Sequence, residues 1–419
     1  MRSQGIKRAA IPRVPGVHIS KMPGQIRMRN RSWIPGVLVQ LALTGLAFGQ
    51  VGGVSSISKS ILTFEAPGAG KGAGQGTSSQ SINDDGEITG NYKDSASVVH
   101  GFVRHKDGTF ESFEAPGASK KATLGTFPES INDKGDVIGY YFTDPGGVRH
   151  GFVRYKDGTI VRFDPPGSQG TVAKHNNDDG LFTGNYVSYD KAHAFVARRD
   201  NSFTTFDPPG SANTAPQGIN ARGEITGYYA DDANSLRGFI RYADGAYAKF
   251  DVPGANAIEG KGTLPMDINS NGDVVGYYHT RPKDGMRAFI RHKDGTFTKF
   301  DPPGSITDDA PHVDDEGYIV RPTAAALSIN ESGDIAGYYG DTAGVVHGFI
   351  RRRDGTYTTF EAPGAARHGN LGTFSESINN RGDITGFYYT GANAVLRGFV
   401  LPHIADLSQA PAKAPVKKP

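Results

Sequence analysis

Short stretches of alternating apolar and polar residues recur along this chain, separated by turns that contain glycine. Residues 100–117 (HGFVRHKDGTFESFEAPG) hold two such stretches, at 101–105 and 109–114. The three residues between them, 106–108, end in glycine, which is typical of the loop of a β-hairpin. Pro116 then ends the second strand, because proline cannot donate a hydrogen bond to a sheet ladder. The pattern therefore predicts an antiparallel hairpin.

Two signatures repeat this arrangement along the chain. A Phe-acid-x-Pro-Gly signature ends the second strand of the hairpin at Phe64, Phe113, Phe163, Phe206, Phe250, Phe300 and Phe360. An Asn-x-x-Gly signature, which predicts a further hairpin, begins at Asn83, Asn132, Asn177, Asn220, Asn269, Asn330 and Asn379. Two hairpins give four strands in every 43 to 60 residues, a period typical of a β-propeller. We expect the strands of the first repeat near 81–83, 87–92, 101–105 and 109–114.

The order of the signatures at the two ends predicts how such a propeller closes. The first signature belongs to a lone strand at about 60–66, whereas the last repeat stops after its third strand, near Phe399. Six complete blades, three C-terminal strands and one N-terminal strand make seven four-stranded antiparallel blades. We therefore predict an all-β, seven-bladed propeller over residues 60–403. Pairing of the N-terminal strand with the last blade would remove free sheet edges.

A basic residue and an acid lie 14 positions apart in this hairpin, at every repeat that is complete. With a three-residue loop, the strand register places the two side chains opposite each other. The last basic residue has no later acid, so its partner should come from the N-terminal strand. The predicted pairs are His100–Glu114, His150–Asp164, His193–Asp207, Arg237–Asp251, Arg287–Asp301, His347–Glu361 and Arg397–Glu65. We interpret them as ties that fix register, since exposed pairs contribute under ~1 kcal/mol each. Four histidines spread around a ring predict no shared metal site.

The tripeptides that begin the third strand carry a family resemblance. They read His-Gly-Phe at 100–102, His-Ala-Phe at 193–195 and Arg-Ala-Phe at 287–289. With the Ile-Asn-x-x-Gly and Gly-Tyr-Tyr elements, the chain resembles the extracellular HAF-repeat proteins, a bacterial group named for that tripeptide. The resemblance covers essentially all of residues 60–402. It implies export and a repeat fold, and it brings no catalytic residues to this sequence.

The two ends of the chain differ from the repeats. The first 49 residues hold eight basic residues and no acid, and an apolar segment at 33–48 ends in small residues. This is typical of a secretory signal peptide cleaved before Gln50, for which Met28 would make a compact start. The alternative is a membrane anchor, although 16 residues interrupted by proline are short for a span. We expect a signal peptide over 1–49, a linker over 50–59 and a disordered tail of Pro, Ala and Lys over 404–419.

Cleavage changes the charge balance of the protein. The chain has 45 basic and 43 acidic residues, and removal of the eight N-terminal ones leaves 37 against 43, a net charge near −6. This removes the support for a nucleic-acid partner. The absence of cysteine excludes disulfides and a lipoprotein anchor. We expect a secreted protein, extracellular or periplasmic, that is monomeric and has no membrane span after cleavage.

Departures from the repeat mark where function could lie, because the repeated ring itself serves as scaffold. At the position of Ser81, the third repeat has His175 and the fifth has Asp267. One residue earlier, Glu129 and Glu376 add carboxylates. If the strand that carries them lines the channel, these four side chains could meet in one axial pocket.

An insertion at 305–327 is the second departure from the repeat. It carries His312 and Arg321 among its polar residues, and long loops of this kind often cover binding sites. We regard it as a candidate loop at a channel mouth, with His312 as a candidate binding residue.

These features favour an exported, non-catalytic binding or scaffold protein that recognises an extracellular carbohydrate or protein. The alternative is an extracellular polysaccharide lyase or hydrolase with its site at one mouth of the channel. In that case His175 would act as the base beside Asp267, and Lys174 or Arg321 would stabilise charge. The sequence predicts no cofactor. Acids in the Asn-x-x-Gly turns faintly resemble a calcium loop, but a cation at the middle position of two copies favours simple turns.

Overall fold

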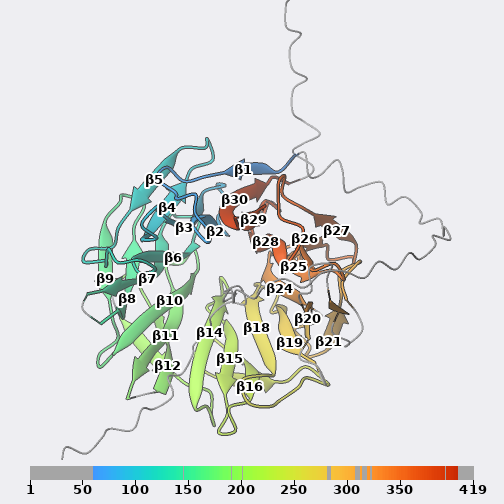
Figure 1. Ribbon diagram of the computed structural model, residues 1–419. Coiled ribbons are helices and arrows are strands. Elements are labelled where there is room, and N and C mark those ends of the chain that lie inside the picture. The colour runs from blue at the N-terminus through green and yellow to red at the C-terminus, as the bar shows by residue number, and fades with distance from the viewer. Residues whose placement is uncertain are drawn as a thin grey trace, which may run out of the picture. The chain divides into compact units, whose positions relative to one another are not determined.

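The computed structural model describes residues 60–403, apart from 145, 190, 201, 281–284, 307–311, 314–318, 321–322 and 392. Within these residues the regular structure is β-sheet, with no α-helix. The expected signal peptide, linker and tail lie outside them. The described residues belong to one compact unit, Val51–Pro419, whose sheets are arranged around a common centre (Figure 1).

Each repeat consists of four strands that follow one another outward from that centre. The first strands are β2 (Gly76–Ile82), β6 (Thr126–Ile131), β10 (Gly170–Asn176), β14 (Asn213–Ile219), β18 (Thr263–Ile268), β24 (Ala324–Ile329) and β28 (Leu371–Ile378). The second strands are β3 (Ile88–Lys93), β7 (Val137–Thr143), β11 (Phe182–Ser188), β15 (Ile225–Ala230), β19 (Val274–His279), β25 (Ile335–Gly340) and β29 (Ile384–Thr390). Figure 1 shows the first strands nearest to the centre, and we call them the innermost strands.

The outer two strands of the repeats form the hairpins predicted from the Phe-acid signature. The third strands are β4 (Val99–Arg104), β8 (Val148–Arg154), β12 (Lys191–Ala197), β16 (Leu236–Arg241), β20 (Met286–Arg291), β26 (Val345–Arg351) and β30 (Val395–Leu401). The fourth strands are β5 (Phe110–Phe113), β9 (Ile160–Phe163), β13 (Phe203–Phe206), β17 (Tyr247–Phe250), β21 (Phe297–Phe300) and β27 (Tyr357–Phe360). The insertion contributes a separate two-stranded sheet, β22 (His312–Val313) with β23 (Ile319–Val320).

Antiparallel pairing joins the four strands of each repeat. Strands β6–β9, β10–β13, β14–β17 and β18–β21 form separate four-stranded sheets. The other three repeats are linked into one twelve-stranded sheet by short parallel pairings of β26 with β28 and of β30 with β2. The chain is therefore all-β and built from four-stranded antiparallel units, as the sequence predicts.

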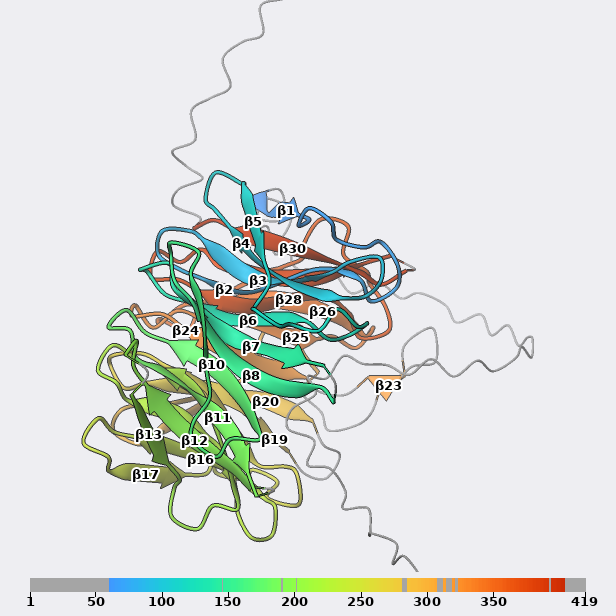
Figure 2. The same cartoon turned by 90° about the vertical axis from the view of Figure 1, so that its left-hand side faces the viewer.

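The N-terminal strand takes the outer position in the last of these units. Strand β1 (Leu62–Phe64) pairs antiparallel with β30, and Thr63 lies opposite Phe399. The two strands lie side by side in both ribbon views (Figures 1 and 2). This is the contact that the end-to-end order of the signatures predicts.

The predicted three-residue hairpin loop is present in the first repeat. His105 donates its N–H to the Thr109 carbonyl oxygen at 2.9 Å, and Gly108 has φ +92°. Gly101 lies opposite Phe113, and a Cβ at Gly101 would stand 2.8 Å from the Phe113 ring. Glycine at this position therefore makes room for the aromatic ring of the fourth strand in this repeat, whereas alanine takes the same position opposite Phe206 and Phe300.

The innermost strand is longer than the sequence suggests. We expected it near 81–83, but β2 runs from Gly76 to Ile82 and ends before Asn83. Its early residues are small and polar, and they are buried because other strands satisfy their hydroxyl groups. Thr77 Oγ1 accepts the Ala66 N–H at 2.9 Å. Asn83 belongs to the turn, since its Oδ1 accepts the Glu87 N–H at 2.8 Å.

Aromatic contacts link each repeat to the next. The Phe of every third strand is fully buried, at Phe102, Phe152, Phe195, Phe239, Phe289, Phe349 and Phe399. In addition, the guanidinium of Arg154 lies 5.1 Å above the ring of Phe113 in the preceding repeat. Arg104 makes the same contact at 4.9 Å with Phe64 of β1. The N-terminal strand thus supplies the first repeat with the neighbour that other repeats receive from the preceding fourth strand.

Candidate functional site

A ring of asparagine side chains ties the turns at one end of the innermost strands. Each Asn of the Asn-x-x-Gly signature donates its side-chain N–H to the backbone carbonyl oxygen of the next one, at 2.9–3.2 Å. The series runs from Asn83 through Asn132, Asn177, Asn220, Asn269 and Asn330 to Asn379, which donates back to Asn83. These buried amides hold neighbouring repeats together, so the signature has a structural role beyond the turn.

His175 and Asp267 line a small cavity of about 150 Å³ at this asparagine end. Asp267 is buried and accepts three hydrogen bonds, from the Ile329 N–H at 3.0 Å, the Ser328 hydroxyl at 3.2 Å and its own neighbour Ile268 at 2.9 Å. Burial raises the pKa of Asp267, and the nearby His175 opposes that shift. In the first repeat, Ser81 accepts the N–H of Ile131 from the next repeat at 3.3 Å, just as Asp267 accepts the N–H of Ile329. Asp267 therefore takes the place of a structural serine.

Acidic side chains surround the same end of the channel. Asp133 accepts the Asp84 N–H at 2.7 Å, and Asp178 accepts the Asp133 N–H at 2.8 Å. Burial, and then the charges of Asp178 and Asp84, raise the pKa of Asp133 to about 6. These carboxylates are therefore further ties between adjacent turns.

A second ring of side chains lies one residue before His175 and Asp267. Each innermost strand has a register shift there, a β-bulge that leaves one residue unpaired in the ladder. The bulged residues are Gln80, Glu129, Lys174, Gln217, Met266, Leu327 and Glu376, and all are part-exposed although their strands are innermost. We call them the bulge ring. It has an apolar side formed by Met266 and Leu327, and a charged side.

The charged side of the bulge ring brings together residues from three separate repeats. Lys174 Nζ lies 3.0 Å from Glu129 Oε2, and both side chains are about one-fifth exposed. Burial and the charge of Glu129 raise the pKa of Glu376 to about 7, while Lys174 opposes the shift. Glu129 and Lys174 lie on innermost strands of neighbouring repeats, and the charges of both act on Glu376 of the last repeat.

Aromatic side chains lie beside both glutamates. Phe127 stacks on Tyr140 at a centroid distance of 5.0 Å, and the charge of Glu129 acts on Tyr140. Phe374 stacks on Phe387 at 5.1 Å and meets Tyr338 edge-on at 5.0 Å. Of the tyrosines at this position in the second strands, Tyr338 is buried, whereas Tyr140, Tyr228 and Tyr277 remain part-exposed.

We expected His175, Asp267, Glu129 and Glu376 to meet in one axial pocket if their strands line the channel. His175 and Asp267 line the cavity at the asparagine end, but Glu129 and Glu376 do not line it. Each of these two glutamates is the unpaired residue of a β-bulge. The sequence shows a trace of this geometry, since Pro128, Pro216 and Pro265 directly precede bulged residues, and proline in a strand marks an edge or a bulge.

The insertion at 305–327 is described only in part. Arg321 is not among the described residues, and the side chain of His312 is not described either. The insertion connects the end of β21 to the start of β24. The asparagine turn follows the opposite end of β24, so His175 does not lie at the strand end from which the insertion departs.

The basic and acidic residues spaced 14 positions apart are in contact in all six hairpins, and the seventh predicted pair, Arg397–Glu65, is also in contact. His150 Nδ1 lies 2.9 Å from Asp164, and Arg237 lies 2.6 Å from Asp251. Arg397 contacts Glu65 of the N-terminal strand at 2.7 Å. The remaining pairs are His100–Glu114, His193–Asp207, Arg287–Asp301 and His347–Glu361. They span the outer hairpins rather than the channel.

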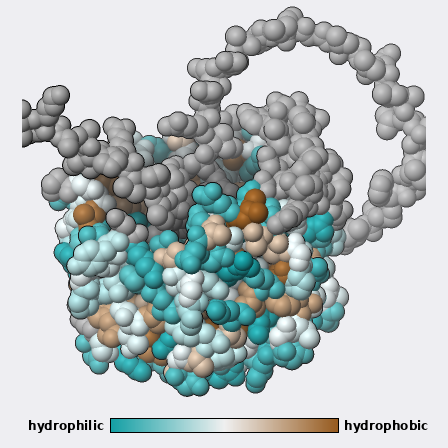
Figure 3. All heavy atoms as spheres, turned by 90° about the horizontal axis from the view of Figure 1, so that it is seen from below, coloured by the Kyte–Doolittle hydropathy of each residue, from teal (hydrophilic) through white to brown (hydrophobic). Residues whose placement is uncertain are grey.

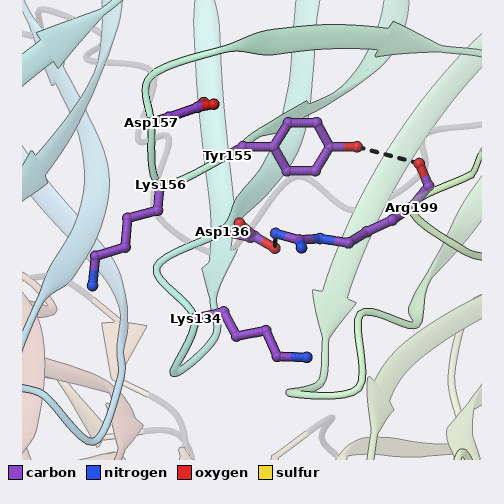
Figure 4. A pocket seen from close by; sticks show the side chains of 6 residues that line it. All are labelled: Lys134, Asp136, Tyr155, Lys156, Asp157 and Arg199. Carbon is purple, nitrogen blue, oxygen red and sulfur yellow. Dashed lines mark hydrogen bonds and ion pairs between the residues drawn. The ribbon is translucent and has the colours of Figure 1, made fainter.

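A broad open hollow of about 620 Å³ lies between the second and third repeats (Figure 4). Arg199 extends into it, forms an ion pair with the buried Asp136 and lies 4.9 Å above the Tyr155 ring. Tyr155 in turn donates its hydroxyl to the Arg199 carbonyl oxygen at 3.3 Å. The central cation of this hollow therefore serves the contact between two repeats, and only Lys134 and Lys156 extend from its sides without a hydrogen-bond or ion-pair partner among the described residues.

The described residues form no helix with the length and apolar character that a membrane span requires. On the face drawn in Figure 3, apolar and polar side chains are intermixed. The large apolar residues that are well exposed in the described ranges are Leu62, Val148, Tyr189 and Ile258.

Comparison with known proteins places the fold. No family model and no curated protein matches the chain. The chain is similar to virginiamycin B lyase from Staphylococcus aureus, solved with quinupristin, with a TM-score of 0.51 and 11% identity over 82% of this chain and 99% of that one. It is also similar to the β-propeller domain of the Trilobed protease from Pyrococcus furiosus, with a TM-score of 0.50 and 11% identity over 79% and 96%. At this identity the likeness defines the fold alone, and the chain is a β-propeller.

Proposed function

We propose that this protein is an exported, non-catalytic β-propeller that binds an extracellular carbohydrate or protein ligand in its central channel. The bulge ring carries the proposal. A threonine recurs at one position of the innermost strands in six of the seven repeats, from Thr77 to Thr373, whereas the bulged residues are Gln, Glu, Lys, Met or Leu and so differ in size and charge. Their part-exposed side chains are available to a ligand, and propeller scaffolds commonly place binding sites at the channel.

The proposal includes a ring of seven blades closed by β1. It is supported by the asparagine series, which returns from Asn379 to Asn83, and by the pairing of β1 with β30. Such mixed closure joins the chain ends within one sheet and leaves no free edge there. The tripeptides of the third strands support membership of the HAF-repeat group.

Export is supported by the composition of residues 1–49 and by the absence of cysteine. The test is N-terminal sequencing of the protein recovered from a culture of an expressing bacterium. We expect the extracytoplasmic protein to begin at Gln50. Recovery of the uncleaved chain from the cytoplasm or the membrane would contradict this part of the proposal.

The ligand site is tested with glycan and protein arrays probed with the purified protein. Lys174→Gln and His175→Ala form a matched pair, because Lys174 belongs to the bulge ring whereas the adjacent His175 lines the cavity at the asparagine end. We expect Lys174→Gln to change the affinity by at least about tenfold, since it breaks the contact with Glu129 and alters the net charge of the bulge ring. His175→Ala should bind as the wild type does. Loss of binding in His175→Ala alone would place the site at the asparagine end instead.

The second candidate function is an extracellular polysaccharide lyase or hydrolase. One observation favours it: the pKa of Glu376 lies near 7, where a carboxyl group can exchange protons, and Lys174 lies close by. A lyase acting on uronate-containing polysaccharides would produce unsaturated ends that absorb in the ultraviolet. Turnover that disappears in Glu376→Gln would replace the binding proposal with this one.

A further inference from the structure

We propose that the channel binds an alkylammonium group with an apolar stem, as a lysine side chain of a protein ligand presents it, and that the Glu376 carboxylate is its counter-ion. This inference rests on the proposed channel-binding function and specifies its ligand. Three features of the bulge ring and its surroundings carry it: an unpaired carboxylate, an adjacent apolar side and aromatic side chains near the carboxylate.

The first feature is the charge count. Lys174 is paired with Glu129 at 3.0 Å, so that these two charges offset each other. Glu376 has no hydrogen bond or ion pair within the residues that the structure describes, and its side chain is part-exposed. One negative charge therefore remains without a counter-ion inside the ring. Since an isolated buried charge is costly, a ligand that brings one positive charge recovers free energy.

The second feature is the order of residues around the ring. Met266, Leu327 and Glu376 follow one another in consecutive repeats, on β18, β24 and β28. A ligand group that reaches Glu376 from this side passes two flexible apolar side chains. A chain of methylene groups that ends in an ammonium matches this sequence, because lysine buries its stem along apolar surface and keeps its charge at the tip.

The third feature is the aromatic surface near Glu376. Phe374 and Phe387 stack at 5.1 Å, and Tyr389 meets both rings edge-on at 5.8 and 5.9 Å. The charge of Glu376 acts on both Tyr338 and Tyr389. Aromatic faces attract cations, so they add to the preference for an ammonium over a neutral group.

The ionisation of Glu376 makes this binding dependent on pH. Glu129 on β6, Lys174 on β10, Tyr338 on β25 and Tyr389 on β29 are the titratable groups that act on it. Burial raises the pKa of both tyrosines, so they stay neutral. Glu376, with a pKa of about 7, is mostly protonated at pH 5.5 and mostly ionised at pH 8. A lysine side chain remains charged throughout.

The experiment is a titration of the full chain, followed by NMR, with a capped tripeptide that contains lysine. Its acetyl-lysine counterpart keeps the size and removes the charge, and n-butylammonium tests a small amine. We expect the lysine peptide to bind at least about tenfold more tightly at pH 8 than at pH 5.5, as the ionised fraction changes. Both the acetyl-lysine peptide at pH 8 and the variant Glu376→Gln should lose about tenfold.

Two variants keep the outcome interpretable. Glu376→Gln should remove the pH dependence as well as the affinity, and its thermal unfolding reports whether it folds. Leu327→Gln, which installs the residue found at this position in two other repeats, should weaken the lysine peptide without changing the pH profile. Equal binding of the lysine and acetyl-lysine peptides, or no binding at about 10 mM, overturns the inference. An array ligand that depends on Lys174 but carries no cation would leave channel binding intact and refute this inference alone.

Discussion

The outer hairpins and the bulge ring of this propeller follow opposite rules. In the outer hairpins the same contacts recur from repeat to repeat: the basic residue meets the acid, and arginine lies over the phenylalanine of the preceding repeat. In the bulge ring the backbone feature recurs, but the side chains are of five kinds, Gln, Glu, Lys, Met and Leu. Uniform contacts are what a symmetric scaffold needs, whereas a ligand site needs a few unlike groups in one place. The difference therefore separates stability from recognition within a single fold.

The largest effect should come from breaking the contact that joins the chain ends. Phe64 packs against Phe102 and Phe110 at 6.4 and 5.9 Å and receives Arg104 on its ring. Phe64→Ala should lower the free energy of unfolding by about 3–4 kcal/mol. Leu62→Ala on the same strand is the control, because Leu62 is 54% exposed, and it should change stability by less than about 0.5 kcal/mol. Urea denaturation measures both variants. An effect of Phe64→Ala as small as that of Leu62→Ala would show that β1 contributes little to the stability of the fold.

The next largest effect should come from the asparagine ring. Asn177 donates to the Asn220 carbonyl oxygen at 2.9 Å and accepts the Leu181 N–H at 3.0 Å. Asn177→Ala leaves the Leu181 N–H unpaired and removes one of two hydrogen bonds to the Asn220 carbonyl oxygen, which still accepts the Gly223 N–H at 3.0 Å. It should cost about 1–3 kcal/mol, without loss of ligand affinity. The exposed Asn271→Ala serves as the comparison. If Asn177→Ala abolished binding while remaining folded, recognition would extend to this end of the channel.

The outer pairs should contribute little, except where a histidine is enclosed by two acids. His347 lies 3.0 Å from Asp341 and 3.1 Å from Glu361, which raise its pKa to about 9 against its burial. The folded-state pKa exceeds the unfolded value of 6.5, so the stabilisation is complete below pH 6.5 and is lost as pH rises through about 9. We expect His347→Gln to cost about 2 kcal/mol at pH 6 and much less at pH 9.5.

Arg237 provides the matched control for that pH dependence. It occupies the same position in another repeat and contacts Asp231 and Asp251 at 3.0 and 2.6 Å. Because arginine does not titrate in this range, the cost of Arg237→Gln should be the same at both pH values. A parallel pH dependence in the two variants would assign the effect to the acids and not to His347.

The smallest effect on stability should have the opposite sign. Burial raises the pKa of Glu376 from 4.5 to about 7, so stability is lost as pH rises across this interval. Glu376→Gln should therefore stabilise the protein by about 1–2 kcal/mol at pH 8 and should be neutral at pH 4.5. Denaturation at the two pH values checks this. A destabilised variant at pH 8 would mean that Glu376 belongs to the scaffold.

The same division explains what could be predicted from the sequence. The hairpin loop at 106–108, the 14-residue pairs and the contact of residues 62–64 with Phe399 follow from spacing, because strand register depends on counting residues. The bulges do not follow from spacing, since an extra residue in one strand leaves the hydrophobic pattern almost unchanged. For this reason the sequence pattern groups Glu129 and Glu376 with His175 and Asp267, although the two glutamates are bulged residues that do not line the cavity.

Contacts between neighbouring repeats could not be predicted from the sequence either. Arg154 and Phe113, or Lys174 and Glu129, lie more than forty residues apart, on neighbouring repeats. Their contact depends on how repeats pack, not on the local pattern. The three prolines before bulged residues were the available signal, and they indicate only where the strand is irregular.

The most direct test of this separation between stability and recognition is to replace the three charged residues of the bulge ring with one uncharged residue. Replacing Glu129, Lys174 and Glu376 together with glutamine installs the residue that Gln80 and Gln217 already supply in other repeats. Ligand affinity on the glycan and protein arrays and the free energy of unfolding are then measured on one protein preparation. The account predicts that ligand binding is lost while stability is unchanged or higher. Retained binding, or loss of the fold, would contradict it.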